Sequence, residues 1–176
     1  MDGAVRLALA KWPNVPACTG WLRLSRRGEW CVPEGPIRHP GLRAFIGRNY
    51  SATPDGQWFF QNGPQRVFVD LDYTPTVLHL ATPNRLETHT GAAVDTLSGA
   101  WLDDEGSLLL ASKAGIALLD DRDLVAILPH LSGDLEDPDA PMALDWAGDR
   151  LPVGRIRREA AASHFGFVAR PSLTTA

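Results

Sequence analysis

Cys18 is the side chain in this sequence that most directly suggests covalent chemistry. It lies in the segment VPACTGW, between a proline-constrained passage and a glycine, where a thiol could be exposed. A nucleophilic thiolate needs a neighbouring cation or helix N-terminus that lowers its pKa, and the local sequence provides neither. Either His39 or His89 could reach Cys18 only through the fold. A thiol enzyme that uses Cys18 with a histidine is therefore one hypothesis, ranked below a structural role for this cysteine.

The five histidines do not form a metal-binding pattern. No two of them stand four residues apart, the spacing that puts two ligands on one helix face. A glycine-rich phosphate loop with a following lysine and a dinucleotide fingerprint are also absent from the sequence. We therefore expect no metal and no cofactor, so any nucleotide would be held by other groups.

Arginine and amide side chains offer a better basis for ligand binding. The polar segment 61–66 lies between two apolar stretches, and a second polar cluster follows the segment 40–48. Arginine binds anions through a bidentate fork, amides recognise hydrogen-bonding edges, and aromatic rings stack on flat ligands. An ordinary turn is the structural alternative for the segment 61–66. The candidate ligand-binding residues are Arg43, Arg48, Asn62, Gln65, Arg66, Tyr73 and Trp21.

Repeated turns predict the elements that position these residues. A charged residue and a glycine lead into an apolar strand three times, as RGEW at 27–30, DGQW at 55–58 and EGSL at 105–108. Glycine adopts the positive φ angles that tight turns require, so each copy is typical of a hairpin. A hairpin followed by an apolar stripe at helical spacing occurs twice, with helices expected at about 39–48 and from about 120.

These patterns predict an α+β fold of two similar lobes, each an antiparallel hairpin sheet with a packed helix, plus a C-terminal helix or arm. We place the boundary within the segment 88–98, which is rich in Thr, Gly, Ala and Ser. The N-terminal hairpin-helix-sheet lobe would span 1–90, with strand 77–80 in its sheet. The C-terminal lobe would span 91–176, with a helix near 156–164 and an arm over 165–168. One continuous sheet in a single compact unit is the alternative.

Composition narrows the possible classes of function. The chain has 176 residues and a formal net charge of −4, which argues against general nucleic-acid binding because phosphate recognition requires a basic surface. No apolar run approaches the ~20 residues needed to span a bilayer, and the N-terminus lacks the pattern of a secretory signal. Two cysteines do not form a disulfide framework. We therefore expect a soluble cytoplasmic protein that binds neither nucleic acid nor membrane.

Longer segments of the chain resemble known families. The segments KWPNVPACTGWLRL, HPGLRAFIGRNY, WFFQNGPQRVFVDLDYTP and HFGFVARP resemble an uncharacterised proteobacterial family of unknown function, over most of the chain. The stretch from GEW to VFVDLDYTP is also similar in layout to a second bacterial family of unknown function, and departs from it at LDYTP. That resemblance implies a two-lobed α+β fold with repeated motifs, a nucleotide-like ligand between the lobes and a signalling role. Neither family has an established reaction, so no functional residue is carried over.

Three hypotheses follow for the function. The leading one is a non-catalytic protein that binds a small anionic or nucleotide-like ligand in a cleft between the lobes, in a regulatory or signalling role. The alternative is a protein-protein interaction module that pairs with a partner or a second copy through a hairpin edge or the C-terminal arm. The third is the thiol enzyme based on Cys18.

Overall fold

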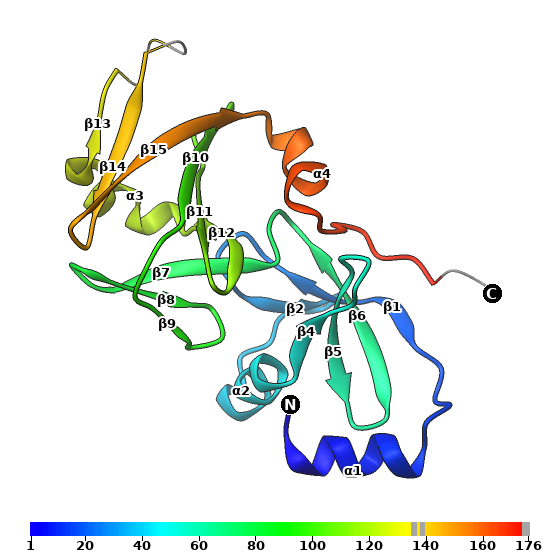
Figure 1. The fold of residues 1–176 in the computed structure, drawn as a ribbon. Helices are drawn as coiled ribbons and strands as arrows, with labels where there is room; N and C mark the ends of the chain where they lie inside the picture. Colours follow the sequence, from blue (N-terminus) through cyan, green and yellow to red (C-terminus); the bar gives the residue numbers. More distant parts are fainter. Residues whose placement is uncertain (135–136, 138–139, 174–176) are drawn as a thin grey trace. The chain divides into compact units, whose positions relative to one another are not determined.

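The computed structural model describes residues 1–134, 137 and 140–173, and the chain divides into two compact units (Figure 1). The first unit contains Met1–Pro75 and the C-terminal segment that begins at Gly166, and the second unit is Thr76–Phe165. Each unit contains a sheet and helices, so the predicted α+β class is confirmed. The division falls earlier than the expected segment 88–98, because the strand that follows Pro75 pairs with a strand of the second sheet.

The described residues of the first unit form two helices and six strands. Its elements are α1 (Gly3–Lys11), β1 (Cys18–Leu24), β2 (Trp30–Val32), β3 (Gly35–Pro36), α2 (Pro40–Arg48), β4 (Tyr50–Ala52), β5 (Trp58–Asn62) and β6 (Gln65–Leu71).

In the part of the second unit that the structure describes, nine strands form one sheet, with short helices beside it in the sequence. Its strands are β7 (Thr76–Thr82), β8 (Arg85–Thr88), β9 (Ala93–Val94), β10 (Gly99–Asp103), β11 (Leu108–Ser112), β12 (Gly115–Leu119), β13 (Leu131–Ser132), β14 (Met142–Trp146) and β15 (Asp149–Ile156). Its helical segments are η1 (Asp121–Asp123), α3 (Leu124–Ile127), η2 (Leu128–His130), η3 (Arg158–Ala160) and α4 (Ala161–Phe165).

The two sheets share one topology. The first has the strand order β3-β2-β1-β6-β5-β4, and the second has β13-β14-β15-β10-β11-β12 followed by β7-β8-β9. In each, two three-stranded antiparallel meanders are joined by one parallel pair, β1 with β6 and β10 with β15. The predicted hairpins are therefore present, but the sheets are mixed rather than wholly antiparallel. Strand 77–80, expected in the first sheet, is part of β7, which pairs in parallel with β12 of the second.

Four hairpins share one type of turn, which begins at a Ser, Thr or Asp three residues before a glycine. The glycine N–H donates to the carbonyl of that Ser, Thr or Asp, and the side-chain oxygen of the same residue accepts from the N–H of the residue that follows the glycine. This bond and the glycine's positive φ fix the three-residue loop. The sequence motif found three of these turns and missed the one at 88–92, where a threonine precedes the glycine. The first residues and glycines are Ser25 and Gly28, Thr53 and Gly56, Thr88 and Gly91, and Asp103 and Gly106.

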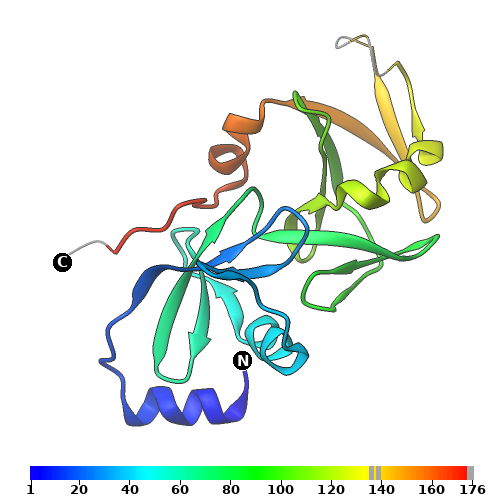
Figure 2. The same cartoon turned by 180° about the vertical axis from the view of Figure 1, so that it is seen from behind.

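The helices match the sequence pattern only in part. His39 caps α2 by accepting the Leu42 N–H on its Nδ1 at 3.2 Å, and Pro40 occupies the first turn, as its fixed φ favours. Both views of the chain place α1 beside the turn between β5 and β6, where a Cβ on Gly63 would lie 3.9 Å from the side chain of Ala8 (Figure 1; Figure 2). The helix expected near 156–164 begins later, because β15 continues to Ile156 in its pairing with β10. No helix among the described residues is long and apolar enough to cross a membrane.

The C-terminal arm belongs to the first unit, not to the second as expected. The Val168 N–H donates to the carbonyl of Gly56 at 2.9 Å, and the Leu71 N–H donates to the carbonyl of Ala169 at 2.9 Å. Phe167 is buried beside them. These bonds hold the arm against the β4-β5 turn and the end of β6, which is a pairing between distant segments that no local pattern reveals.

Replacing Gly56 with alanine should release the arm. A Cβ at Gly56 would lie 2.3 Å from the carbonyl oxygen of Gly166, too close for any real contact. Gly106→Ala is the matched control, because Gly106 has a φ of +80° against +82° for Gly56 but no atom within 4 Å of its Cβ. In each variant the free energy of unfolding should fall by roughly 1–2 kcal/mol, because alanine is strained in the left-handed backbone conformation. In limited proteolysis, only Gly56→Ala should lose the C-terminal segment faster than wild type, and equal protection in both variants would count against this contact.

Candidate functional site

A bulge in β1 builds one wall of a pocket in the first unit. Cys18 pairs with Val67 and Leu22 pairs with Val69. Between these two pairs, β1 advances by four residues while β6 advances by two, so β1 contains extra residues that form the bulge. Gly20 lies within this bulge at a φ of +74°, which only glycine adopts without strain. As a result, the neighbours Trp21 and Leu22 both line the pocket, and Trp21 stays 64% exposed.

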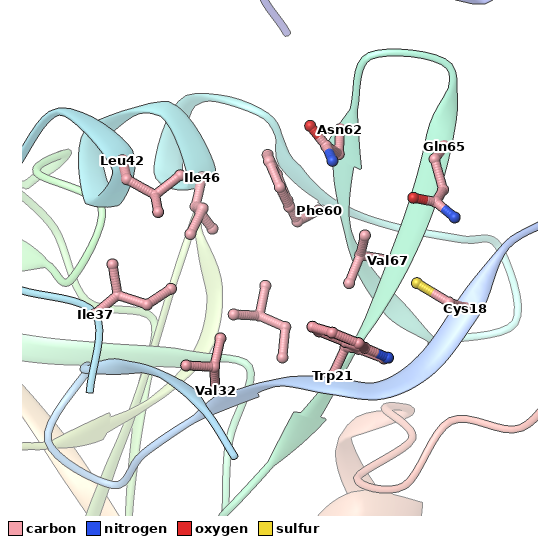
Figure 3. A pocket seen from close by; sticks show the side chains of 11 residues that line it. Cys18, Trp21, Val32, Ile37, Leu42, Ile46, Phe60, Asn62, Gln65 and Val67 are labelled. Carbon is pink, nitrogen blue, oxygen red and sulfur yellow. The ribbon is translucent and has the colours of Figure 1, made fainter. Parts of the chain in front are cut away.

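The pocket has a volume of about 480 Å³ and lies on the face of the first sheet that α2 covers (Figure 3). Strands β1, β2, β5 and β6 supply its floor, and α2 with the residue Ile37 before it supplies one side. This volume is in the range of small-molecule sites. The lining residues are Cys18, Trp21, Leu22, Val32, Ile37, Leu42, Ile46, Phe60, Asn62, Gln65 and Val67.

Two amides mark one end of an otherwise apolar pocket. Asn62 and Gln65 are partners across the β5-β6 hairpin and lie near its turn, whereas Val32, Ile37 and Leu42 lie at the opposite end (Figure 3). Gln65 is oriented by its Nε2, which donates to the carbonyl of Pro16 at 3.2 Å. The exposed Asn62 amide offers both donors and an acceptor. The pocket can therefore hold an apolar body and make hydrogen bonds to one end of it.

Only three of the seven candidate residues, Trp21, Asn62 and Gln65, line this pocket. The guanidinium of Arg48 is held by Asp2, with Nε 3.3 Å from Oδ1, and this contact lowers the pKa of the Asp2 carboxyl.

The other candidates lie elsewhere on the first unit. Arg66 alternates with Val67 and so faces the opposite side of the sheet, with its guanidinium carbon 4.7 Å from the centre of the Phe59 ring. Tyr73 is buried with Arg26 over its ring, and Arg43 is exposed on α2. No arginine or lysine is among the residues that line the pocket.

The sequence patterns did not predict the apolar residues that line the pocket. In the sequence, Val32, Ile37, Leu42 and Phe60 are indistinguishable from ordinary core residues. An isolated glycine within a strand pattern is the available signal, since it favours a bulge. Gly20 in CTGWLRL is such a glycine.

Cys18 lines the pocket, but its surroundings disfavour a thiolate. Partial burial raises the pKa of the Cys18 thiol, so the protonated form dominates at neutral pH. The Nδ1 of His39 is engaged in the α2 cap. His89 belongs to the second unit, where burial and the charge of His79 lower its pKa to about 3.

A group of ionisable side chains in the second unit surrounds Asp120, which is fully buried. Its Oδ2 lies 3.1 Å from the Nδ1 of His79, and its Oδ1 accepts from the Nε of Arg122 at 2.9 Å. The same Oδ1 accepts the Arg122 N–H, so Asp120 caps the helical segment that follows. Among the described residues, no three His, Cys, Asp or Glu side chains form a metal site.

The fold defines a two-lobed α+β protein with an internal repeat, one copy of which carries an open apolar pocket. The chain belongs to the family described as "Protein of unknown function (DUF2946)", whose model matches residues 1–172. This confirms the predicted membership of an uncharacterised family.

Two solved structures are similar to this chain. The crystal structure of a DUF1285 family protein from Silicibacter pomeroyi DSS-3 is similar at a TM-score of 0.55 and 18% identity, covering 86% of this chain and 94% of that chain. A DUF1285 family protein from Shewanella baltica OS155 gives a TM-score of 0.46 and 16% identity, covering 62% of this chain and 91% of that chain. No curated protein matches the sequence. The first likeness supports the two-lobed fold alone.

The reactivity of Cys18 can be measured in a Cys31→Ser variant, where it is the only thiol. Because burial raises its pKa, Cys18 should react with iodoacetamide at pH 7.5 more slowly than free cysteine, and the rate should rise as the pH passes the ordinary thiol range. The same variant unfolded in guanidinium is the control and should react at the free rate. Fast alkylation of the folded protein at neutral pH would revive the thiol-enzyme hypothesis.

Acid should destabilise the second unit through His89. The folded state leaves His89 neutral down to a pKa of about 3, while the unfolded state takes up the proton near pH 6.5. Above about pH 6.5, His89 is neutral in both states and does not lower the free energy of unfolding. Below that pH, its protonation in the unfolded state lowers the free energy of unfolding by up to about 1.4 kcal/mol for each pH unit. The free energy of unfolding, measured with urea between pH 7 and 4, should depend less steeply on pH in His89→Gln than in wild type, whatever the stability of the variant at pH 7. The same pH dependence in both proteins would show that His89 is charged in the folded state.

Proposed function

We propose that this protein is a non-catalytic ligand-binding protein with a regulatory role, and that the pocket of the first unit is its binding site. The observation that carries the proposal is an open pocket of about 480 Å³ between α2 and the first sheet. Such a pocket costs packing energy that a ligand would restore.

The lining indicates the chemistry of the ligand. Nine of the eleven lining side chains are apolar or cysteine, and the other two are amides. An anion would lose its hydration there without gaining a cation, which is costly. The ligand expected from the pocket is therefore an uncharged or amphipathic molecule with an apolar body and one hydrogen-bonding end. A nucleotide-like ligand would fit only with its base in the pocket and its phosphates outside.

The two other hypotheses have less support. The C-terminal arm is engaged within the first unit, and the outermost strands β3, β4, β9 and β13 are two or three residues long, which limits pairing with a partner strand. The raised pKa of Cys18 argues against a thiol enzyme.

A thermal-shift screen tests the proposal, because a ligand that binds the native state raises its melting temperature. The panel contains 1-octanol, cyclohexanol and indole as uncharged compounds, with AMP and a cyclic dinucleotide as anionic ones. We expect a dose-dependent shift with at least one uncharged compound and weaker or no shift with the nucleotides. No shift with any compound would contradict the proposal.

Variants locate the binding. Leu42→Glu places a charge at the pocket wall on a residue that is 42% exposed, and should weaken binding at least tenfold without unfolding the protein. Leu7→Glu is the matched control, since Leu7 is an exposed helical leucine on α1 outside the pocket. Arg66→Ala should also leave binding unchanged. Loss of binding in Arg66→Ala alone would place the ligand on the other face of the sheet.

A further inference from the structure

The second unit contains a copy of the pocket wall, and the parallel strand pairs fix which residues correspond. Leu24 and Leu102 each stand directly before the side-chain-capped turn that ends their strand. Across the parallel pairs, Leu24 faces Leu71 and Leu102 faces Arg155. Leu71 in β6 therefore corresponds to Arg155 in β15.

The same correspondence extends to the amide end of the pocket. Six residues before these positions stand Gln65 and Asp149, the first residues of β6 and β15. Their partners across the hairpins are Asn62 and Trp146, and a two-residue turn joins each pair. Trp146 thus occupies in the second unit the position that Asn62 occupies in the first.

The environments of these two residues differ sharply. Trp146 is 4% exposed and belongs to the hydrophobic core of the second unit, beside Leu144, which corresponds to Phe60. The ring of His130 packs edge-on against it with centroids 5.4 Å apart. Asn62, in contrast, is exposed at the mouth of the open pocket. The repeated framework therefore has room for a large aromatic ring at this position, which the second unit fills with Trp146 and where the first unit has the smaller amide Asn62.

We infer that the pocket of the first unit binds a flat aromatic ring system of about the size of indole, seated where the second unit places the side chain of Trp146. The inference rests on the proposed function and names its ligand class. Phe60, Val67 and Ile46 contact the ring, Trp21 packs against it from the bulge, and the amides of Asn62 and Gln65 bind polar atoms on its rim. Aromatic rings gain from such edge and face contacts beyond their buried area.

Indole itself is the probe, and cyclohexanol and 1-octanol are the non-aromatic comparisons. Titrations of the full chain, followed by NMR shifts of the Asn62 and Gln65 side-chain amides, should give one indole site at least tenfold tighter than that for cyclohexanol. Asn62→Trp supplies the missing ring from the chain and should abolish indole binding. Asn62→Ala removes the same amide without adding a ring, so it should weaken indole binding only severalfold.

The opposite variant tests the same inference in the second unit. Trp146→Ala should open a cavity there, as removal of a buried ring does, and an apolar cavity of that kind binds small aromatic molecules. Indole should then bind at two sites per chain and should raise the melting temperature of Trp146→Ala more than that of wild type. The Trp146→Ala variant still tests the inference if Asn62→Trp does not fold.

The outcomes separate the two claims. If 1-octanol or cyclohexanol binds the pocket and is lost in Leu42→Glu while indole does not bind, the proposed function stands and the aromatic inference is overturned. Undiminished indole binding in a folded Asn62→Trp protein also overturns the inference. If none of the three compounds binds, both claims fail.

Discussion

The parallel pair between β1 and β6 is the constraint on which the first unit depends. It joins two antiparallel meanders that are separated by α2, and it is the contact that makes one sheet from them. Its register also sets the site, because the mismatch between Cys18 and Leu22 is absorbed by the bulge that turns Trp21 to the pocket. A shift of one residue in this pairing would move every apolar side chain of β1 to the other face.

The same pairing, between β10 and β15, organises the second unit, so one framework serves two different interiors. In the second unit the framework is closed by Trp146 and extended by β7-β8-β9, and its buried residues form a continuous core. In the first unit a polar amide stands at the corresponding position and the space is open. Equivalent topology thus fixes where the two interiors lie, and single side chains decide whether each is filled.

Electrostatics explains why the arginines of the first unit do not define the site. Arg48 is engaged with Asp2 near the start of α1, and Arg66 lies over an aromatic ring on the far face of the sheet. Charged side chains near an apolar pocket would have to give up hydration to enter it, whereas amides lose less. A site built from valine, leucine and phenylalanine with two amides at one end is consistent with that cost.

The sequence by itself determined the local features of this protein. The glycine turns, the capped helix that begins at Pro40 and the alternation of Val67, Val69 and Leu71 follow from backbone preferences and periodicity, which act over a few residues. The two-lobed α+β class and the unknown-function family also followed from these patterns and from the resemblances that the sequence carried.

Only the tertiary structure decided which strands pair in parallel, where the chain divides, and where the C-terminal arm docks. It also decided that Trp21, Asn62 and Gln65 share a pocket while Arg66, one residue from Gln65, does not. The physical reason is that these features depend on register between segments far apart in the chain. Side chains on a strand alternate between faces, so a neighbour in sequence is separated from the site by the whole thickness of the sheet.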